Sequence, residues 1–207
     1  MKLHIINLVE RTDRNYIMEQ QVKKFKFEYE FFDAIRGNQS FGPGMSHCKC
    51  INYAIENNLN MILVLEDDVK LKEDTISRLK DLLKILPHDW DLFIGGASGM
   101  NNCVRLNNAI FKVGDFSGLH FVVYREKSYT KVLKWLNAKK SRGFRKFGKY
   151  PHIDRFLGKM SKGGNLNVYA PFNFLVDTYD SYSDVRRINT DDKGMFDKVK
   201  NYLNTVI

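Results

Sequence analysis

The sequence predicts an α/β fold in which helices cover both faces of a mixed, mostly parallel sheet, in three layers. Apolar, β-prone runs alternate with amphipathic helical patterns over residues 3–96, an order typical of parallel sheets. With 207 residues, 43% of them hydrophobic, the chain can bury one sizeable core, and we expect a single domain over residues 1–207.

The first half of the chain has a regular β-α-β pattern. Residues 3–8 form an apolar strand, residues 14–24 a helical pattern, and residues 27–32 a second strand that alternates aromatic with acidic residues. After a loop rich in glycine, apolar residues recur at helical spacing over residues 45–59 and lead into a strand at residues 61–65. A further helix and strand are expected at residues 76–86 and 90–94.

Antiparallel pairing is expected after residue 96, which makes the sheet mixed. Asn107-Asn108 lies between two β-prone runs and predicts a hairpin over residues 104–113, and residues 119–124 form a further strand. The remaining elements are helices at 128–136, 151–159 and 194–206 and a strand at 166–170. The last helix has an apolar stripe that we expect to pack against this domain, and it can also lead into a further module.

The most informative segment is the apolar strand at 61–65, which ends in Glu66, Asp67 and Asp68. Adjacent anions repel one another, so a divalent cation is a natural compensation, and carboxylate oxygens favour Mg²⁺ or Mn²⁺ over zinc. Because side chains alternate along an extended chain, Glu66 and Asp68 share one side and Asp67 takes the other. Acids after a strand also cap helices, but Asp74 is better placed for that role.

Composition restricts the class of protein and of partner. The net charge of +9 and the pI near 9.4 suggest an anionic partner, which nucleic acid, an acidic membrane surface or a phosphorylated small molecule would each satisfy. The amino terminus does not resemble a signal peptide, and no apolar run approaches the roughly 20 residues that cross a bilayer. We expect a soluble, cytoplasmic protein with three buried, reduced cysteines.

Several segments, in this order, resemble glycosyltransferase family 25, which includes lipooligosaccharide and procollagen galactosyltransferases. They are the Ile-Asn-Leu run and Arg-x-x-Arg element in residues 5–14, the Ser-His step in 42–47, the Leu-Glu-Asp-Asp core in 62–69, the Pro-x-x-Asp segment in 151–154, and the Ser-Asp-Val in 183–185. Gly44 stands where the family usually has cysteine. The resemblance implies a GT-A fold, a nucleotide-sugar donor that is usually a uridine diphosphate sugar, inversion at the anomeric carbon, and an acidic motif that holds a divalent metal on the diphosphate.

On this reading Asp68 is the direct metal ligand. Glu66 contacts the metal, its water or the donor ribose, while Asp67 supports the site or becomes a ligand if the strand twists. His120 and Asp184 are candidates to complete the coordination. A packed strand histidine is the commoner reading of His120, and a turn residue explains Asp184 equally well.

Asp154 is the candidate general base for the acceptor hydroxyl, because it lies in the first turn of an expected helix, where the dipole favours its ionised form. A helix-terminal acid without a chemical role is the alternative. Further residues are assigned to the donor: Asn7, Arg11, Arg14, Ser46, His47, Gly95 and Gly96. Solvated arginines, a helix cap, a packed imidazole and a glycine turn are the corresponding alternatives.

The leading hypothesis is a metal-dependent hexosyltransferase of glycan biosynthesis that uses Mn²⁺ or Mg²⁺ and a UDP-hexose, with a glycan, protein or lipid-linked acceptor. A nucleotidyl or phosphoryl transferase is the enzymatic alternative, and a nucleic-acid-binding module the non-enzymatic one, although acids at a strand end would repel phosphate. We therefore expect no nucleic-acid partner. The basic, aromatic loop at 139–149 is solvated, a lid, or a peripheral membrane contact.

Overall fold

A computed structural model describes residues 1–37, 41–141, 152–183 and 188–206. Its centre is an eight-stranded sheet with the order β2-β1-β3-β10-β5-β11-β8-β7. The strands of this sheet are β1 (Leu3–Asn7), β2 (Tyr29–Asp33), β3 (Met61–Glu66), β5 (Leu92–Gly96), β7 (Val104–Arg105), β8 (Ile110–Lys112), β10 (Phe121–Arg125) and β11 (Val168–Pro171). β2, β1 and β3 are parallel, β10 is antiparallel to both β3 and β5, and β5 is parallel to β11.

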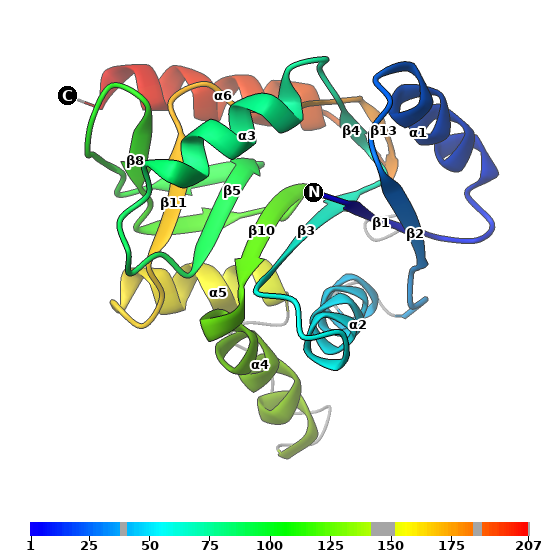
Figure 1. Cartoon of the computed structure of the whole chain (residues 1–207), viewed down its shortest axis with the longest axis horizontal. Helices are drawn as coiled ribbons and strands as arrows, with labels where there is room; N and C mark the ends of the chain where they lie inside the picture. Colours follow the sequence, from blue (N-terminus) through cyan, green and yellow to red (C-terminus); the bar gives the residue numbers. More distant parts are fainter. Residues whose placement is uncertain (38–40, 142–151, 184–187, 207) are drawn as a thin grey trace.

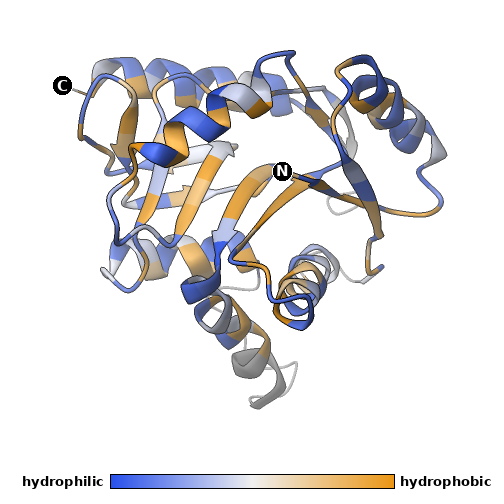
Figure 2. Ribbon diagram, in the orientation of Figure 1, coloured by the Kyte–Doolittle hydropathy of each residue, from blue (hydrophilic) through white to orange (hydrophobic). Residues whose placement is uncertain are grey.

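Helices cover both faces of this sheet. Figure 1 shows α2, α4 and α5 along one side and α3 and α6 along the other. The helices are α1 (Thr12–Lys24), α2 (Gly42–Glu56), α3 (Thr75–Lys84), α4 (Tyr129–Ser141), α5 (Ile153–Lys162) and α6 (Asp192–Thr205), with a 3-10 turn η1 (Glu126–Ser128) before α4. Strands β1, β5 and β11 are buried along their whole length, and Figure 2 shows the central strands as mostly hydrophobic. This burial on both faces is why their sequences read as continuous apolar runs.

Three short sheets lie outside the central one. β4 (Val69–Lys70) pairs with β12 (Asp177–Thr178), β6 (Gly99–Asn101) with β9 (Asp115–Ser117), and β13 (Ser181–Ser183) with β14 (Ile188–Thr190). The first of these holds the segment after the acids, since the Thr178 hydroxyl donates to the Asp68 carbonyl at 2.9 Å. The backbone at Asp68 is therefore fixed from the carboxyl-terminal part of the chain.

The predicted fold class is confirmed: the molecule is α/β with a mixed, mainly parallel sheet between helical layers. The predicted hairpin at 104–113 is present as β7 and β8, and Asp74 stands at the N-cap position of α3. The stripe on α6 packs inward as expected, because Phe196, Val199 and Leu203 are buried. All three cysteines are buried and free.

Two expectations fall wholly or partly outside the described residues. Most of the basic loop, from residue 142 onward, and the candidate ligand Asp184 are among the positions that the structure does not describe. In the described part, none of the helices combines the length and apolarity that a bilayer crossing needs.

Candidate active site

The site lies at the edge of the sheet where β1 and β3 end. These strands run in parallel with Ile6 opposite Glu66, so their carboxyl ends reach the same edge. β10 runs the opposite way beside β3 and therefore brings its amino end to this edge, where the Glu66 amide donates to the His120 carbonyl at 3.0 Å. One antiparallel strand thus places a histidine next to acids that lie 52 and 54 positions earlier in the chain, as the numbering shows.

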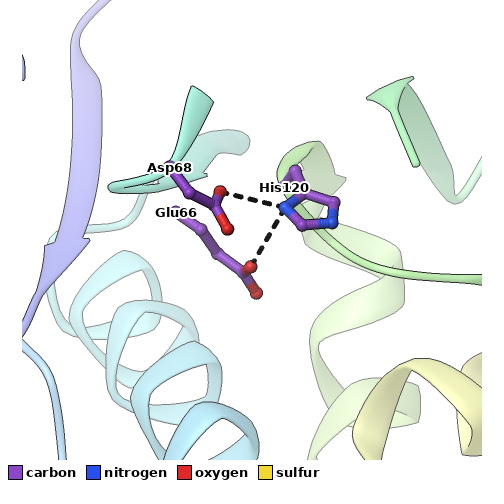
Figure 3. A group of neighbouring side chains, drawn as sticks. All are labelled: Glu66, Asp68 and His120. Atoms are coloured by element: carbon purple, nitrogen blue, oxygen red, sulfur yellow. Dashed lines mark hydrogen bonds and ion pairs between the residues drawn. The ribbon is translucent and has the colours of Figure 1, made fainter. Parts of the chain in front are cut away.

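Glu66, Asp68 and His120 point toward one another (Figure 3). The Nδ1 atom of His120 lies 2.9 Å from Asp68 Oδ1 and 3.4 Å from Glu66 Oε2. The other ring nitrogen, Nε2, lies 2.6 Å from the Ser98 hydroxyl. Both ring nitrogens therefore have polar partners, and these contacts fix the orientation of the ring.

The charged groups of this cluster are largely shielded from water, since the side chains of His120 and Asp68 are only 8% and 11% exposed. Their charges therefore interact strongly with one another. Burial lowers the pKa of His120, but Asp68 and Glu66 outweigh that effect and raise it to about 10. Burial likewise opposes ionisation of Asp68, yet the imidazolium lowers the pKa of Asp68 below its ordinary value. The pair is an anion held by a cation.

The same three residues fit a divalent metal. They offer two carboxylate oxygens and one imidazole nitrogen within 4.8 Å of one another. Mn²⁺ and Mg²⁺ prefer such oxygen-rich sets and need further ligands, which phosphate oxygens commonly supply. Binding would require His120 to give up the proton on Nδ1, since that nitrogen is the ligand atom. The sequence alone favoured a packed strand histidine at position 120. In the structure, His120 lies between the two acids of the candidate metal site.

Asp67 turns to the opposite side, as the alternation along the strand predicts. Its Oδ2 accepts from the Asn7 amide at 2.7 Å, and its Oδ1 accepts from the Arg14 guanidinium at 2.6 Å. Burial raises the pKa of Asp67 to about 6, while Arg14 and Asn7 limit the rise. Asp67 therefore binds the first strand and the first helix to β3, and it is not part of the cation cluster.

A cavity of about 630 Å³ opens over these acids, within the size range of small-molecule sites. The wall of the cavity is apolar at the ends of β1 and β2, where Ile6, Leu8, Ala34 and Ile35 line it. Charged and polar residues line the rest, and they include Arg14, Arg36, Ser46, His47, Glu66, Asp67, Asp68, Ser98, His120, Asp154, Arg155 and Asp192. The cavity can therefore receive a ligand that has one apolar and one anionic part.

Ser46 and His47 reach this cavity from the first turns of α2. The Ser46 hydroxyl accepts from the Ile35 amide at 2.8 Å and donates to the Gly42 carbonyl at 2.9 Å, so it ties the loop after β2 to the helix. His47 is 1% exposed and lies 3.5 Å from Glu66 through Nε2. Because His47 lies beside Glu66, an acid of the cluster, it can interact with the site as well as pack in the core.

Asp154 lies on the same cavity, in the first turn of α5. Its Oδ2 accepts from the Gly118 amide at 2.8 Å, and its Oδ1 accepts from the Arg155 amide at 2.7 Å. Gly118 is two residues before His120, so a short loop connects the candidate base to the acidic cluster. Gly118 has φ of +81°, a conformation that favours glycine.

Four residues assigned to the donor do not line the cavity, and one of them, Asn7, instead donates to Asp67 at 2.7 Å. Gly95 and Gly96 do not line the cavity; a Cβ at Gly95 would lie 2.4 Å from the Phe121 ring and one at Gly96 would lie 2.8 Å from Val176. Close packing in β5 explains both glycines, and their expected approach to a sugar stays a prediction. Arg11 is also off the cavity lining, and its guanidinium makes two bonds of 2.9 Å to Asp13.

Sequence reasoning missed other residues of the cavity. Ser98, Gly118, Arg36 and Asp192 were not assigned, although all of them line it. Ser98 lies two residues after the Gly95-Gly96 pair, and the position of this pair at a strand end was a signal from which Ser98 could have been predicted. Asp192 is 8% exposed at the start of α6, and it reaches the site only because α6 returns from the far end of the chain.

Comparison with known proteins agrees with this geometry. The model of glycosyltransferase family 25 (LPS biosynthesis protein) matches residues 1–42 and 41–98, slightly less than half of the chain. Among curated proteins, none matches. The resemblance expected from the motifs is confirmed over this amino-terminal part, which holds the acidic segment.

Solved structures share the fold at low sequence identity. A glycosyltransferase involved in the glycosylation of the major capsid of PBCV-1 is 9% identical, with a TM-score of 0.59 over 94% of this chain and 97% of that chain. The inositol-1-phosphate CTP transferase from T. maritima is 11% identical, with a TM-score of 0.49 over 100% of this chain and 97% of that chain. At 9% identity, the likeness to the first of these structures indicates the fold alone.

Proposed function

We propose that this protein is a glycosyltransferase of family 25 that transfers a hexose from a nucleotide sugar to a hydroxyl acceptor and depends on a divalent metal. The observation that carries the proposal is the convergence of Glu66, Asp68 and His120 at the end of β3, inside a cavity with room for a ligand. A UDP-hexose is the donor that the family resemblance implies. The acceptor is a glycan, a protein or a lipid-linked sugar.

Glu66, Asp68 and His120 would hold Mn²⁺ or Mg²⁺, and the metal would supply positive charge to the diphosphate leaving group. Three protein ligands leave coordination positions for phosphate oxygens. Asp67, through Arg14 and Asn7, keeps the strand end from shifting, so the two ligand carboxylates stay in register. Ser98 supports this arrangement because it fixes the far side of the His120 ring.

The nucleoside would lie against the ends of β1 and β2. Ile6, Leu8, Ala34 and Ile35 provide an apolar wall there, and Arg14 and Arg36 provide positive charge near it. This placement follows the general rule that open α/β sheets bind ligands beyond the carboxyl ends of their strands. The placement agrees with the expected donor contact of Arg14, whereas Asn7 and Arg11 do not line the cavity.

Asp154 would act as the general base in an inverting transfer. It would take the proton of the acceptor hydroxyl as that oxygen bonds to the anomeric carbon, while the bond from this carbon to the diphosphate breaks and its electron pair leaves with the nucleoside diphosphate. Two backbone amides orient the Asp154 carboxylate, and each of its oxygens keeps a further lone pair for the acceptor. The acceptor would then enter on the α5 side of the cavity, opposite the nucleotide.

A donor screen tests the reaction. The protein is incubated with Mn²⁺, a panel of UDP-hexoses and simple glycosides, and release of free nucleotide is followed together with formation of a glycosylated product. We expect uridine diphosphate to be released and the release to stop with EDTA. Pyrophosphate release from a nucleoside triphosphate and a sugar phosphate would instead identify a nucleotidyltransferase, and it would contradict the proposal.

Asp154→Asn tests the base. We expect turnover to fall by about 10²–10⁴-fold, while the dissociation constant of the donor stays within a few fold, because Asn has nearly the same shape but cannot take a proton. Its single carbonyl oxygen can keep only one of the two bonds from the backbone amides of Gly118 and Arg155. Asp115→Asn is a matched control, since Asp115 is buried against the same helix and does not line the cavity. Full turnover in Asp154→Asn would remove the assignment.

A further inference from the structure

A buried tyrosine and a buried histidine lie behind Glu66. The Tyr124 hydroxyl on β10 is 2.9 Å from His47 Nδ1, and His47 Nε2 is 3.5 Å from Glu66 Oε1. Tyr124 is fully buried and does not line the cavity, while His47 lines it with 1% of its surface exposed. The three side chains therefore form a chain that begins in the core and ends at a candidate metal ligand.

The direction of the first hydrogen bond follows from the surroundings of Tyr124. Burial raises the pKa of Tyr124 well above its ordinary value, so the phenol keeps its proton. Among the described residues, His47 Nδ1 is the one hydrogen-bond partner found for this hydroxyl. A buried hydroxyl hydrogen needs an acceptor, and Nδ1 is therefore the acceptor.

The tautomer of His47 follows in turn. A neutral imidazole that accepts at Nδ1 carries its hydrogen at Nε2, and this hydrogen faces Glu66 Oε1. At 3.5 Å the contact is at the long limit of a hydrogen bond, so its effect is to steer the carboxylate. Glu66 thus lies between two imidazoles, with Oε1 toward His47 and Oε2 toward His120 at 3.4 Å.

We propose that Tyr124 and His47 are positioning residues: Tyr124 selects the Nε2–H tautomer of His47, and His47 orients the Glu66 carboxylate toward Asp68 and His120. This role differs from contact with the donor, because Tyr124 cannot reach the cavity. It rests on the proposed function in one respect, namely that Glu66 belongs to a metal site. Outer partners of metal ligands typically change affinity by about 10–100-fold when they are removed, and the long contact here favours the lower end.

The test compares two tyrosine-to-phenylalanine variants of the whole chain. Tyr124→Phe removes one oxygen and keeps the ring, so His47 loses the group that fixes its tautomer. Tyr129→Phe is the matched control, because Tyr129 is 2% exposed and donates its hydroxyl to the Leu59 carbonyl at 2.9 Å, away from the cavity. Both variants lose one buried hydrogen bond and should lose similar stability.

Two readouts are made on each variant. Nitrogen-15 NMR of the histidines at neutral pH reports the tautomer of His47, and calorimetry reports the dissociation constant of Mn²⁺ in the presence of uridine diphosphate. In the wild type and in Tyr129→Phe we expect the Nε2–H form. In Tyr124→Phe we expect a mixture of tautomers and Mn²⁺ binding that is weaker by about tenfold.

Substitutions of His47 provide the second test. His47→Gln places an amide near the position of Nε2 and should recover part of the Mn²⁺ affinity that His47→Leu loses. The proposal is overturned if the wild type shows the Nδ1–H form or an imidazolium, or if Tyr124→Phe binds Mn²⁺ as tightly as Tyr129→Phe does. A wild type that shows the expected tautomer but binds no Mn²⁺ would instead contradict the proposed function.

Discussion

Asp67 and Asp68 are neighbours in the chain and have opposite surroundings. Asp67 is bonded by Arg14 and Asn7, two residues of the first β-α unit, and its position is settled within the amino-terminal part of the fold. Asp68 faces His120, which arrives on an antiparallel strand from much later in the chain, and its backbone is held by Thr178. Both acids line the cavity, but Asp67 joins two structural elements and Asp68 belongs to the cluster that could hold a metal.

The difference shows how a strand end can divide adjacent carboxylates between two roles. Because side chains alternate, the same three-residue acidic run presents Asp67 to fixed protein donors and Glu66 and Asp68 to a shared site. The repulsion between these anions is relieved on both sides, by a guanidinium on one and by an imidazole on the other. This comparison leads to five predictions.

The largest effect is expected when each aspartate is changed to asparagine. In Asp68→Asn, Mn²⁺ affinity measured by calorimetry with uridine diphosphate should fall by more than the ~100-fold that outer partners of a ligand can cause, because a ligand itself is lost. In Asp67→Asn the affinity should change by no more than about threefold, since its oxygens are directed to Asn7 and Arg14. Equal losses in the two variants would break the comparison.

Arg14→Gln tests the structural side. It leaves the Asp67 carboxylate buried without its cation, which should lower the free energy of unfolding by about 3 kcal/mol at pH 7. The matched control is Arg36→Gln, whose ion pair with Glu10 is mostly exposed and whose loss should cost less than about 1 kcal/mol. Chemical denaturation measures both.

The pH dependence of the Arg14→Gln effect has a definite sign. Asp67 has a pKa of about 6 in the fold against 3.8 as its ordinary value, and loss of Arg14 raises it further. An acid with a raised pKa in the folded state contributes stability in its protonated form and loses it as the pH rises through that pKa. The destabilisation should therefore be largest above the raised pKa of the variant and should shrink as the pH falls to about 6, below which Asp67 is protonated in both proteins. A deficit that stays constant from high pH down to about pH 6 would contradict this account.

A third strand end at the same edge sharpens the comparison. Gly95 is the residue before the last one of β5 and packs against Phe121, so Gly95→Ala should destabilise the fold by about 1–3 kcal/mol through overpacking. Thermal unfolding and Mn²⁺ titration should show lower stability and unchanged affinity in the folded protein. Weaker donor binding without a loss of stability would instead support a contact between Gly95 and the donor sugar.

The smallest effect concerns the far side of the His120 ring. Ser98→Ala removes the partner of Nε2 and should weaken Mn²⁺ binding by about tenfold. Asn15→Ala is the control on the Asp67 side, because Asn15 bonds Asn7 at 3.4 Å and is remote from the cation cluster. Calorimetry that finds both variants equal to the wild type would show that the ring is held by packing alone.

Local pattern was sufficient to predict the amino-terminal half of the fold. Apolar runs and helical spacing give β1, α1, β2, α2 and β3 in order, because each element is defined by residues within a few positions of one another. The same holds for the acidic segment, whose alternation assigns Asp67 and Asp68 to opposite sides before any tertiary contact is known.

Long-range pairing could not be predicted in the same way. Strand propensity indicates β10, but nothing local says that it inserts between β3 and β5 and so brings His120 to Asp68. The approach of Asp192 depends on α6 returning to the site, and the packing of Gly95 depends on the neighbouring ring of Phe121. These are properties of the assembled sheet, and a glycine step or a lone acid looks the same in either setting.

The most direct test is the location of the metal. Crystals of the protein soaked with Mn²⁺ and uridine diphosphate should give an anomalous scattering peak at the manganese edge between Glu66, Asp68 and His120 Nδ1, with phosphate oxygens completing the coordination. A bound nucleotide with no anomalous peak at these three residues, or a peak on Asp67 instead, would contradict the central claim.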